Sequence, residues 1–288
     1  MEGIIDSHHH IWDLSVRDQD WMLSPSMDAL RRNFDLQEMT PQARSAGVCK
    51  TVLVQTVAIP EETPELLAVA ADHALVAGVV GWTDLADPGV SETLARLRGL
   101  PGGELLVGVR HHVAREPGPE WLTRADVRQG MSALAEANIA CELFALPHQL
   151  PWCTDAAAAL PGVRFILDHL GMPPISTGEM EPWATNIRSF AKLPNSVCKV
   201  TSLATLASWD SWTTEIIRPY LDTVVDAFTP QRIMFGTDWP VCTLAASYSK
   251  ATETIRQLTG HLTSQERIEI FSGTATRAYN LEAGILAD

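Results

Sequence analysis

The sequence lacks the cysteine patterns of a disulfide framework or a cysteine-based zinc site. Its five cysteines are scattered, odd in number and contain no C-x-x-C pair. Secreted disulfide-rich domains and zinc ribbons pair their cysteines at short, regular spacings. We therefore predict reduced thiols and a cytoplasmic location.

Positive charge and long hydrophobic runs are also scarce. Lysine and arginine total 21 against 35 acidic residues, a net charge of −14, and no stretch gathers the basic residues. This charge balance disfavours nucleic acid and anionic membranes as partners. No run approaches the roughly 18 apolar residues of a membrane span, and the amino terminus has no signal-peptide pattern. The sequence predicts a protein without a membrane partner and leaves a homo-oligomer open.

What the sequence does contain is a regular alternation of two patterns. Apolar runs typical of buried strands are separated by stretches with apolar residues at three- and four-residue spacing, as amphipathic helices require. The strand-like runs number eight and cover residues 3–8, 51–56, 76–82, 105–113, 139–146, 163–171, 196–203 and 232–240. The clearest helical stretches cover residues 63–75, 92–100, 125–138 and 212–228.

Eight strands joined by helices predict an α/β fold, a single (β/α)8 barrel. The length of 288 residues suits such a barrel, and no linker rich in Pro, Gly or Ser divides the chain. We predict one domain over residues 1–288. The alternative is an open doubly wound sheet, which is disfavoured because no G-x-G-x-x-G follows the first strand.

Titratable side chains stand where the predicted strands end. In "IIDSHHHIW" the first strand ends with His8 and His10, and their i, i+2 spacing puts both on one face. The other strand-end candidates are Arg110 and His111 on the fourth strand, Asp168 and His169 on the sixth, Lys199 on the seventh and Asp238 on the eighth. Catalytic groups of a barrel lie at the carboxyl ends of its strands, so we expect these side chains to converge.

Two kinds of chemistry fit these residues. Imidazole nitrogens and a carboxylate, from His8, His10, His169 and Asp238, suit one divalent metal, in particular zinc. The same residues also suit a metal-free hydrolytic site, in which Asp238 takes a proton from water and the imidazoles stabilise an oxyanion. The residue types alone leave both alternatives open.

Further candidates have a structural alternative each. Arg110 and Lys199 either bind a substrate or form ion pairs of the fold, because a cation in an apolar strand needs an anionic partner. Trp12 and Trp239 either line the pocket or pack between loops.

Seven segments in a fixed order resemble the sugar-lactonase branch of the amidohydrolase superfamily, which includes fucono- and rhamnono-lactonases and 2-pyrone-4,6-dicarboxylate lactonase. They are "IDSHHHIW", "GVCKTVLVQT", "VVGWTDL", "LVGVRHHV", "ILDHLGMP", "IMFGTDWPV" and "FSGTATRAYNL". The likeness covers nearly the whole chain, and the combination is far more specific than any one motif.

The resemblance implies a (β/α)8 barrel that hydrolyses a lactone of a sugar acid, with a small-molecule lactone as its partner. It matches His8, His10, His169 and Asp238 to catalytic or metal-binding positions, and it brings Arg110 and His111 to the substrate. Some members of this branch work without metal, and others hold a single zinc ion.

The sequence departs from the pattern of the resembling proteins at two places. The superfamily often has a histidine on strand 5, where this chain has Glu142, so a binuclear metal centre is disfavoured. The branch often shows "KLSG" on strand 7, where this chain has "KVTS"; Lys199 is retained and Ser202 replaces the glycine.

We therefore expect a hydrolase in which water attacks a lactone carbonyl, with Asp238 as general base. His8, His10 and His169 would hold the metal or the oxyanion, and Arg110, His111, Lys199, Trp12 and Trp239 would contact the substrate. One rival function is the metal-dependent decarboxylation of an aromatic or unsaturated acid, a reaction of a sister branch. A non-catalytic binding barrel is the other.

Overall fold

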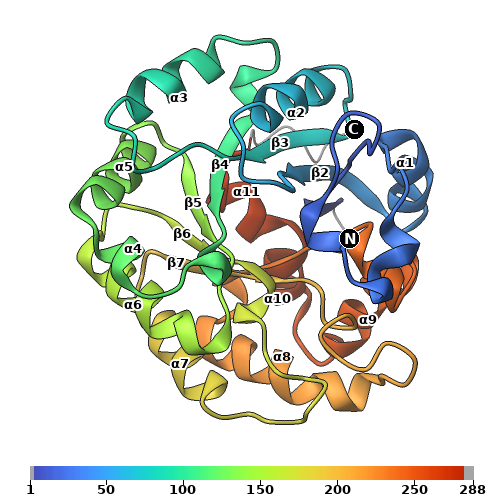
Figure 1. Ribbon diagram of the computed structural model, residues 1–288. Coiled ribbons are helices and arrows are strands. Elements are labelled where there is room, and N and C mark those ends of the chain that lie inside the picture. Colours follow the sequence, from blue (N-terminus) through green and yellow to red (C-terminus); the bar gives the residue numbers. More distant parts are fainter. Residues whose placement is uncertain (1–2, 282–288) are drawn as a thin grey trace.

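Eight parallel strands form the centre of the protein (Figure 1), as the alternating pattern predicts. The structure, a computed structural model, describes residues 3–281. The strands are β1 (Ile4–His9), β2 (Val48–Val54), β3 (Val76–Gly81), β4 (Leu106–His111), β5 (Ala140–Leu143), β6 (Phe165–Leu167), β7 (Ser196–Val200) and β8 (Ile233–Phe235). Each strand pairs with the next in the chain. The predicted α/β class and barrel are confirmed.

The barrel closes between β1 and the segment that follows β8. The N–H of Asp238 donates to the carbonyl of His8 at 2.8 Å, and the N–H of His10 donates to the carbonyl of Trp239 at 2.7 Å. This pairing places the last predicted site residue directly beside the first two.

Helices surround the strands and bury their apolar faces against them (Figure 1). Asp35, Ser247 and Thr263 accept a backbone N–H at the starts of α1, α9 and α10, as helix N-caps do. The α-helices are α1 (Leu36–Ser45), α2 (Glu62–Ala71), α3 (Val90–Arg98), α4 (Glu120–Thr123), α5 (Ala125–Glu136), α6 (Leu150–Ala159), α7 (Trp183–Ala191), α8 (Thr214–Phe228), α9 (Tyr248–Leu258), α10 (Ser264–Ile268) and α11 (Thr274–Ala278).

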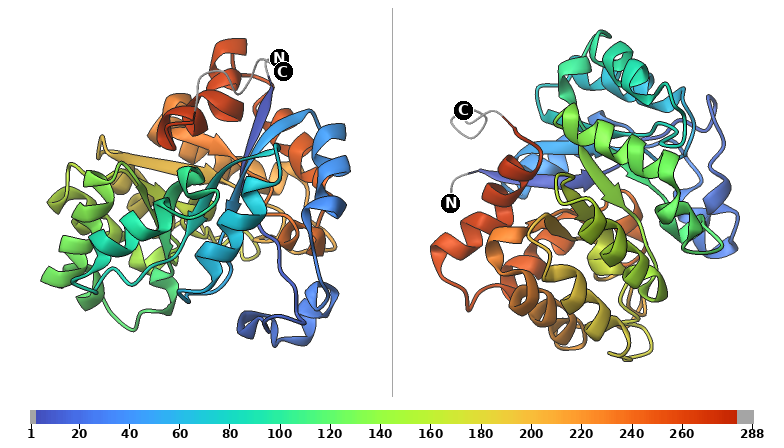
Figure 2. Two further views of the ribbon diagram at one scale, coloured as in Figure 1. Left: turned by 90° about the horizontal axis from the view of Figure 1, so that it is seen from above. Right: turned by 90° about the vertical axis from the view of Figure 1, so that its left-hand side faces the viewer.

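The amino-terminal end of the barrel is filled by a separate apolar cluster. Strand residues such as Val52, Ile166 and Met234 pack there with Ala275 and Tyr279 from the end of the chain. Figure 2 shows α10 and α11, in red, at the end of the barrel where β1 begins. The opposite, carboxyl end is therefore the end that remains for a cavity.

Three sequence predictions concern the whole chain. Residues 1–2 and 282–288 of the predicted 1–288 domain lie outside the described residues. All five cysteines are free thiols in the structure. Within residues 3–281, no helix combines the length and apolar character needed to cross a bilayer.

Candidate active site

A cavity of about 320 Å³ opens at the carboxyl ends of the strands. Its polar lining comes from strand ends and includes His10, Arg110, His169 and Asp238. Its outer lining comes from loops and is mostly apolar. That loop lining comprises Trp21, Met27, Arg115, Met172, Thr205, Leu206, Trp209, Val241 and Leu244. The cavity thus has a polar floor beneath apolar walls.

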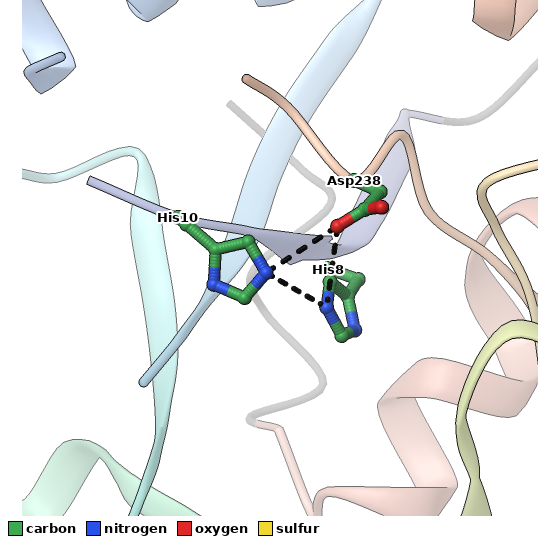
Figure 3. A group of neighbouring side chains, drawn as sticks. All are labelled: His8, His10 and Asp238. Atoms are coloured by element: carbon green, nitrogen blue, oxygen red, sulfur yellow. Dashed lines mark hydrogen bonds and ion pairs between the residues drawn. The ribbon is translucent and has the colours of Figure 1, made fainter. Parts of the chain in front are cut away.

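His8, His10 and Asp238 form a compact group at this floor (Figure 3). The Nε2 atoms of His8 and His10 lie 3.1 Å apart. Asp238 Oδ1 lies 3.6 Å from His8 Nε2 and 3.3 Å from His10 Nε2. Spacing along β1 and closure of the barrel bring the three side chains together, as the sequence predicts.

A buried carboxylate fixes the segment that carries Asp238. Asp6 Oδ2 accepts hydrogen bonds from Thr237 Oγ1 at 2.6 Å and from the Tyr248 hydroxyl at 2.7 Å. Asp6 Oδ1 also accepts the backbone N–H of Thr237 at 2.9 Å. Because Asp6 belongs to β1, these bonds hold the residue before Asp238 against the strand that carries His8.

The donor set of this group fits a divalent metal. Four ligands placed tetrahedrally about 2.0–2.1 Å from zinc are roughly 3.3–3.4 Å from one another. The three donor separations of 3.1, 3.3 and 3.6 Å bracket this value. His10 Nδ1 donates to the carbonyl of Val54 at 2.7 Å, which leaves its Nε2 lone pair directed at the group.

His169 belongs to a different set of donors from the one that was predicted. Its donor atoms group with those of His8 and Asp168, whereas His8, His10 and Asp238 form their own set. The ring of His169 lies 4.7 Å from that of His8, measured between centroids. Its Nδ1 contacts Thr201 Oγ1 at 2.6 Å and Ser202 Oγ at 3.1 Å.

Ser202 links His169 to Asp238. In the sequence it stood out only because it replaces the glycine of the "KLSG" pattern, so its role in the site was not predicted. Its hydroxyl donates to Asp238 Oδ2 and lies beside His169 Nδ1. Its φ of 59° lies in the left-handed region that favours glycine. The glycine of the resembling pattern would adopt this backbone freely but would supply no hydroxyl to Asp238.

Positive φ recurs at three other residues that line the cavity, His169, Met172 and Asp238. His169 has a φ of 50° and Asp238 a φ of 60°. Side chains other than glycine rarely adopt this conformation, and strain of this kind, costing about 1–3 kcal/mol per residue, concentrates at functional sites. The backbone is therefore bent to aim these side chains into the cavity.

The buried charges of the site have opposite partners. Asp168 Oδ2 lies 3.2 Å from Arg110 Nη1, and its Oδ1 lies 3.3 Å from Lys199 Nζ. Burial raises the pKa of Asp168, but Lys199, His8 and Arg110 outweigh burial and hold that pKa well below its usual range. For Asp238, burial likewise opposes ionisation, and His169 and His10 more than offset it, so its pKa is lowered.

Two imidazoles of the site, those of His8 and His169, are favoured in their neutral forms. Burial, with the charge of Lys199, lowers the pKa of His8 well below its ordinary value, and burial lowers that of His169. Neutral imidazoles beside ionised carboxylates are the protonation states that both a metal and an incoming water require.

Several residues predicted to contact the substrate do not line the cavity. His111 stacks on Trp121 at 3.4 Å and contacts Glu116 at 3.1 Å. Trp12 packs against Phe34 and Trp21, Trp239 is fully buried beside Phe34, and Lys199 is fully buried beneath the floor. Of the predicted substrate contacts, Arg110 is the one that lines the cavity.

His112 lines the cavity where His111 was expected. Side chains alternate along a strand, so an inward Arg110 puts His111 outside and His112 inside. Gln55 Nε2 and His112 Nε2 lie 3.3 Å apart, and burial lowers the pKa of His112 well below its ordinary value. The period-two pattern of "VRHH" was the signal that identifies His112.

Comparisons with known proteins agree with this architecture. The sequence profile of the amidohydrolase family matches residues 5–281. The L-fucono-1,5-lactonase of Burkholderia multivorans is 33% identical over 288 residues, covering 96% of each chain. A crystal structure of a Burkholderia multivorans amidohydrolase with bound zinc has a TM-score of 0.90 and 33% identity, covering 97% of this chain and all of its own.

A more distant structure shares the fold. A Pseudomonas putida protein assigned as a 2-pyrone-4,6-dicarboxylic acid hydrolase has a TM-score of 0.78 at 22% identity. The alignment covers 98% of this chain and 99% of that protein. At this identity the likeness supports the barrel and carries no conclusion about the substrate.

Proposed function

Because the chain belongs to the amidohydrolase family, we propose that it hydrolyses the ring ester of a sugar-acid lactone. The observation that carries the proposal is the convergence of His8, His10, His169 and Asp238 at the floor of the strand-end cavity. Its likeness to an L-fucono-1,5-lactonase over 96% of both chains supports a lactone as the substrate.

In the proposed reaction Asp238 acts on the attacking water. Its carboxylate is ionised, Ser202 Oγ donates to its Oδ2, and its Oδ1 lies 3.3 Å from His10 Nε2. As the water oxygen bonds to the lactone carbonyl carbon, Asp238 takes the water proton. The ester C–O bond then breaks, and Asp238 returns the proton to the ring oxygen, which becomes the hydroxyl of the product acid.

Arg110 supplies the positive charge that the reaction needs. Arg110 lines the cavity, and its Nη1 lies 3.4 Å from His8 Nε2. Its guanidinium is therefore directed at the floor of the cavity, beside His8. Negative charge develops on the carbonyl oxygen during the attack, and a fixed donor at that place is worth about 3–4 kcal/mol. His112 and Thr56, which also line the cavity, are placed to contact substrate hydroxyls.

His8, His10 and Asp238 would hold one divalent ion, for which we propose zinc. The donor types and separations suit it, and a structure at 33% identity contains zinc. When bound, such an ion supplies Lewis-acid polarisation of the carbonyl. The chain's own residues would still orient the substrate and move the proton.

The test is acid release from a panel of aldonolactones, followed with a pH indicator for the wild type and for Asp238→Asn. We expect the wild type to hydrolyse at least one lactone far above background and the variant to lose that activity while melting at a similar temperature. If the wild type opens no lactone but releases carbon dioxide from an aromatic acid, the decarboxylase function replaces this proposal.

A further inference from the structure

A line of buried polar contacts runs from the end of the chain to the floor of the cavity. The Tyr279 hydroxyl donates to Glu142 Oε1, and Lys199 Nζ donates to Glu142 Oε2 at 2.6 Å. Lys199 Nζ also lies 3.1 Å from His8 Nδ1. We call Tyr279, Glu142 and Lys199 the relay.

The relay is sealed from solvent and lies beneath the site. Glu142 and Lys199 are fully buried and Tyr279 is 2% exposed, and none of the three lines the cavity. Tyr279 directly follows α11 and belongs to the apolar cluster that fills the amino-terminal end of the barrel. The last described residues are thereby connected to β5, to β7 and, through Lys199, to β1.

Contacts with neighbouring side chains fix the position of each member of the relay. Lys199 Nζ donates to Glu142 Oε2 at 2.6 Å, forms an ion pair with Asp168 Oδ1 at 3.3 Å and lies 3.1 Å from His8 Nδ1. Glu142 is held from both sides, by Lys199 on one oxygen and by Tyr279 on the other. The position of the ammonium therefore depends on where Tyr279 holds Glu142.

Apolar side chains at these positions would stabilise the fold at a lower desolvation cost than the relay does. Burying an ion pair costs desolvation, and apolar residues of similar volume often stabilise a core as well or better. The apolar cluster directly below already fills the barrel in this way. What the relay adds is a fixed charge against His8 and Asp168, two groups at the floor of the site.

We propose that Glu142 and Tyr279 are positioning residues for the reaction, which act by fixing Lys199 against His8 and Asp168. This inference rests on the proposed lactone hydrolysis. Neither residue touches the substrate, so their removal should lower the rate of the chemical step and leave substrate binding nearly unchanged.

The test compares Tyr279→Phe and Glu142→Gln with a matched control. Tyr220 is also 2% exposed, and its hydroxyl donates to the carbonyl of Glu179 at 3.2 Å, outside the relay. Tyr220→Phe therefore removes a buried tyrosine hydroxyl without touching the relay. Steady-state kinetics on the best lactone are measured together with ¹⁵N chemical shifts of the His8 ring and the melting temperature.

We expect kcat to fall about tenfold in Tyr279→Phe and about a hundredfold in Glu142→Gln, the range found for groups that orient active-site ligands. KM should stay within roughly twofold, because the relay makes no contact with the cavity, so binding and chemistry separate. The His8 ring shifts should change in both variants and stay constant in Tyr220→Phe. Tyr220→Phe should also keep its kcat.

Two results would overturn the inference. One is an unchanged His8 ring signal in both relay variants. The other is a loss of kcat in Tyr220→Phe equal to that in Tyr279→Phe at equal melting temperature. A wild type without activity on any lactone would reject the proposed function instead, and the His8 signal would still decide whether the relay positions that ring.

Discussion

The two ends of the barrel differ in the kind of side chain that they bury. At the amino-terminal end, Val52, Ile166 and Met234 pack with apolar side chains of α11. At the carboxyl end, His8, Asp168 and Lys199 are also fully buried, and each has a polar partner. Apolar burial stabilises the fold directly, whereas charged burial costs free energy unless partners are fixed. The comparison indicates that one end serves stability and the other chemistry.

The largest expected effect is that of Asp238→Asn at the carboxyl end. The amide keeps the shape of the side chain and removes the proton acceptor, so kcat/KM for lactone hydrolysis should fall roughly 10²–10⁴-fold. Chemical denaturation should show a free energy of unfolding within about 1 kcal/mol of the wild type. An active Asn variant would remove the base from the proposed reaction.

Metal content tests the same end in a second way. The wild type, reconstituted with zinc and desalted, should retain about one ion per chain, since three ligands converge. His10→Ala removes one ligand, and its zinc content by elemental mass spectrometry should fall below about a tenth of an ion per chain. Equal zinc in both proteins would place the ion elsewhere.

The amino-terminal end is tested with Ile166→Ala. Ile166 is fully buried in the apolar cluster, so truncation should lower the free energy of unfolding by about 2–5 kcal/mol. Below the new melting temperature, kcat should remain within about twofold of the wild type. A large fall in kcat at a temperature where the variant is folded would show that packing at the amino-terminal end also determines the rate of the reaction.

A smaller effect is expected for Ser202→Ala. The variant loses the hydroxyl that donates to Asp238, and a hydrogen bond to a charged group contributes about 1.5–3 kcal/mol. If that contribution acts on the reaction, kcat should fall about 10–100-fold. Ser202→Gly accommodates the φ of 59° without strain but also lacks the hydroxyl. Its free energy of unfolding should therefore exceed that of Ser202→Ala, and its kcat should be no higher.

The smallest effect is expected for His111→Phe. Phenylalanine can keep the stacking on Trp121, and the side chain lies outside the cavity, so kcat/KM should change less than about twofold. His112→Phe changes a residue that lines the cavity, so it should raise KM more than His111→Phe does. The opposite order would restore the original assignment of His111 to the substrate site.

The fold was predictable from local patterns in the sequence. Apolar runs such as 51–56 and 76–82 overlap β2 and β3, because buried parallel strands are apolar on both faces. Strand order along the chain then placed His8, His10 and Asp238 at one end. Their convergence needed no knowledge of side-chain contacts, because barrel topology alone brings β1 and β8 together.

Other features of the site depend on contacts that spacing does not reveal. Glu142 and Tyr279 are 137 positions apart, and no local pattern indicates that their side chains meet. In the sequence, Lys199 is a cation that is costly to bury in an apolar strand, and its anionic partners Glu142 and Asp168 are apparent only in the structure. Trp12 and Trp239 pack against Phe34 and do not line the cavity. The sequence does not distinguish these two roles, because an aromatic ring suits a protein core as well as a substrate pocket.

The central claim is that water attacks the carbonyl carbon of a lactone at the floor of the cavity. Hydrolysis in H₂¹⁸O, followed by mass spectrometry of the product and its fragments, tests this most directly. Attack at the carbonyl predicts one ¹⁸O atom in the carboxylate of the product and none in the new hydroxyl. Label in the hydroxyl would show that the other C–O bond breaks, and that result would contradict the proposed roles of Arg110 and Asp238.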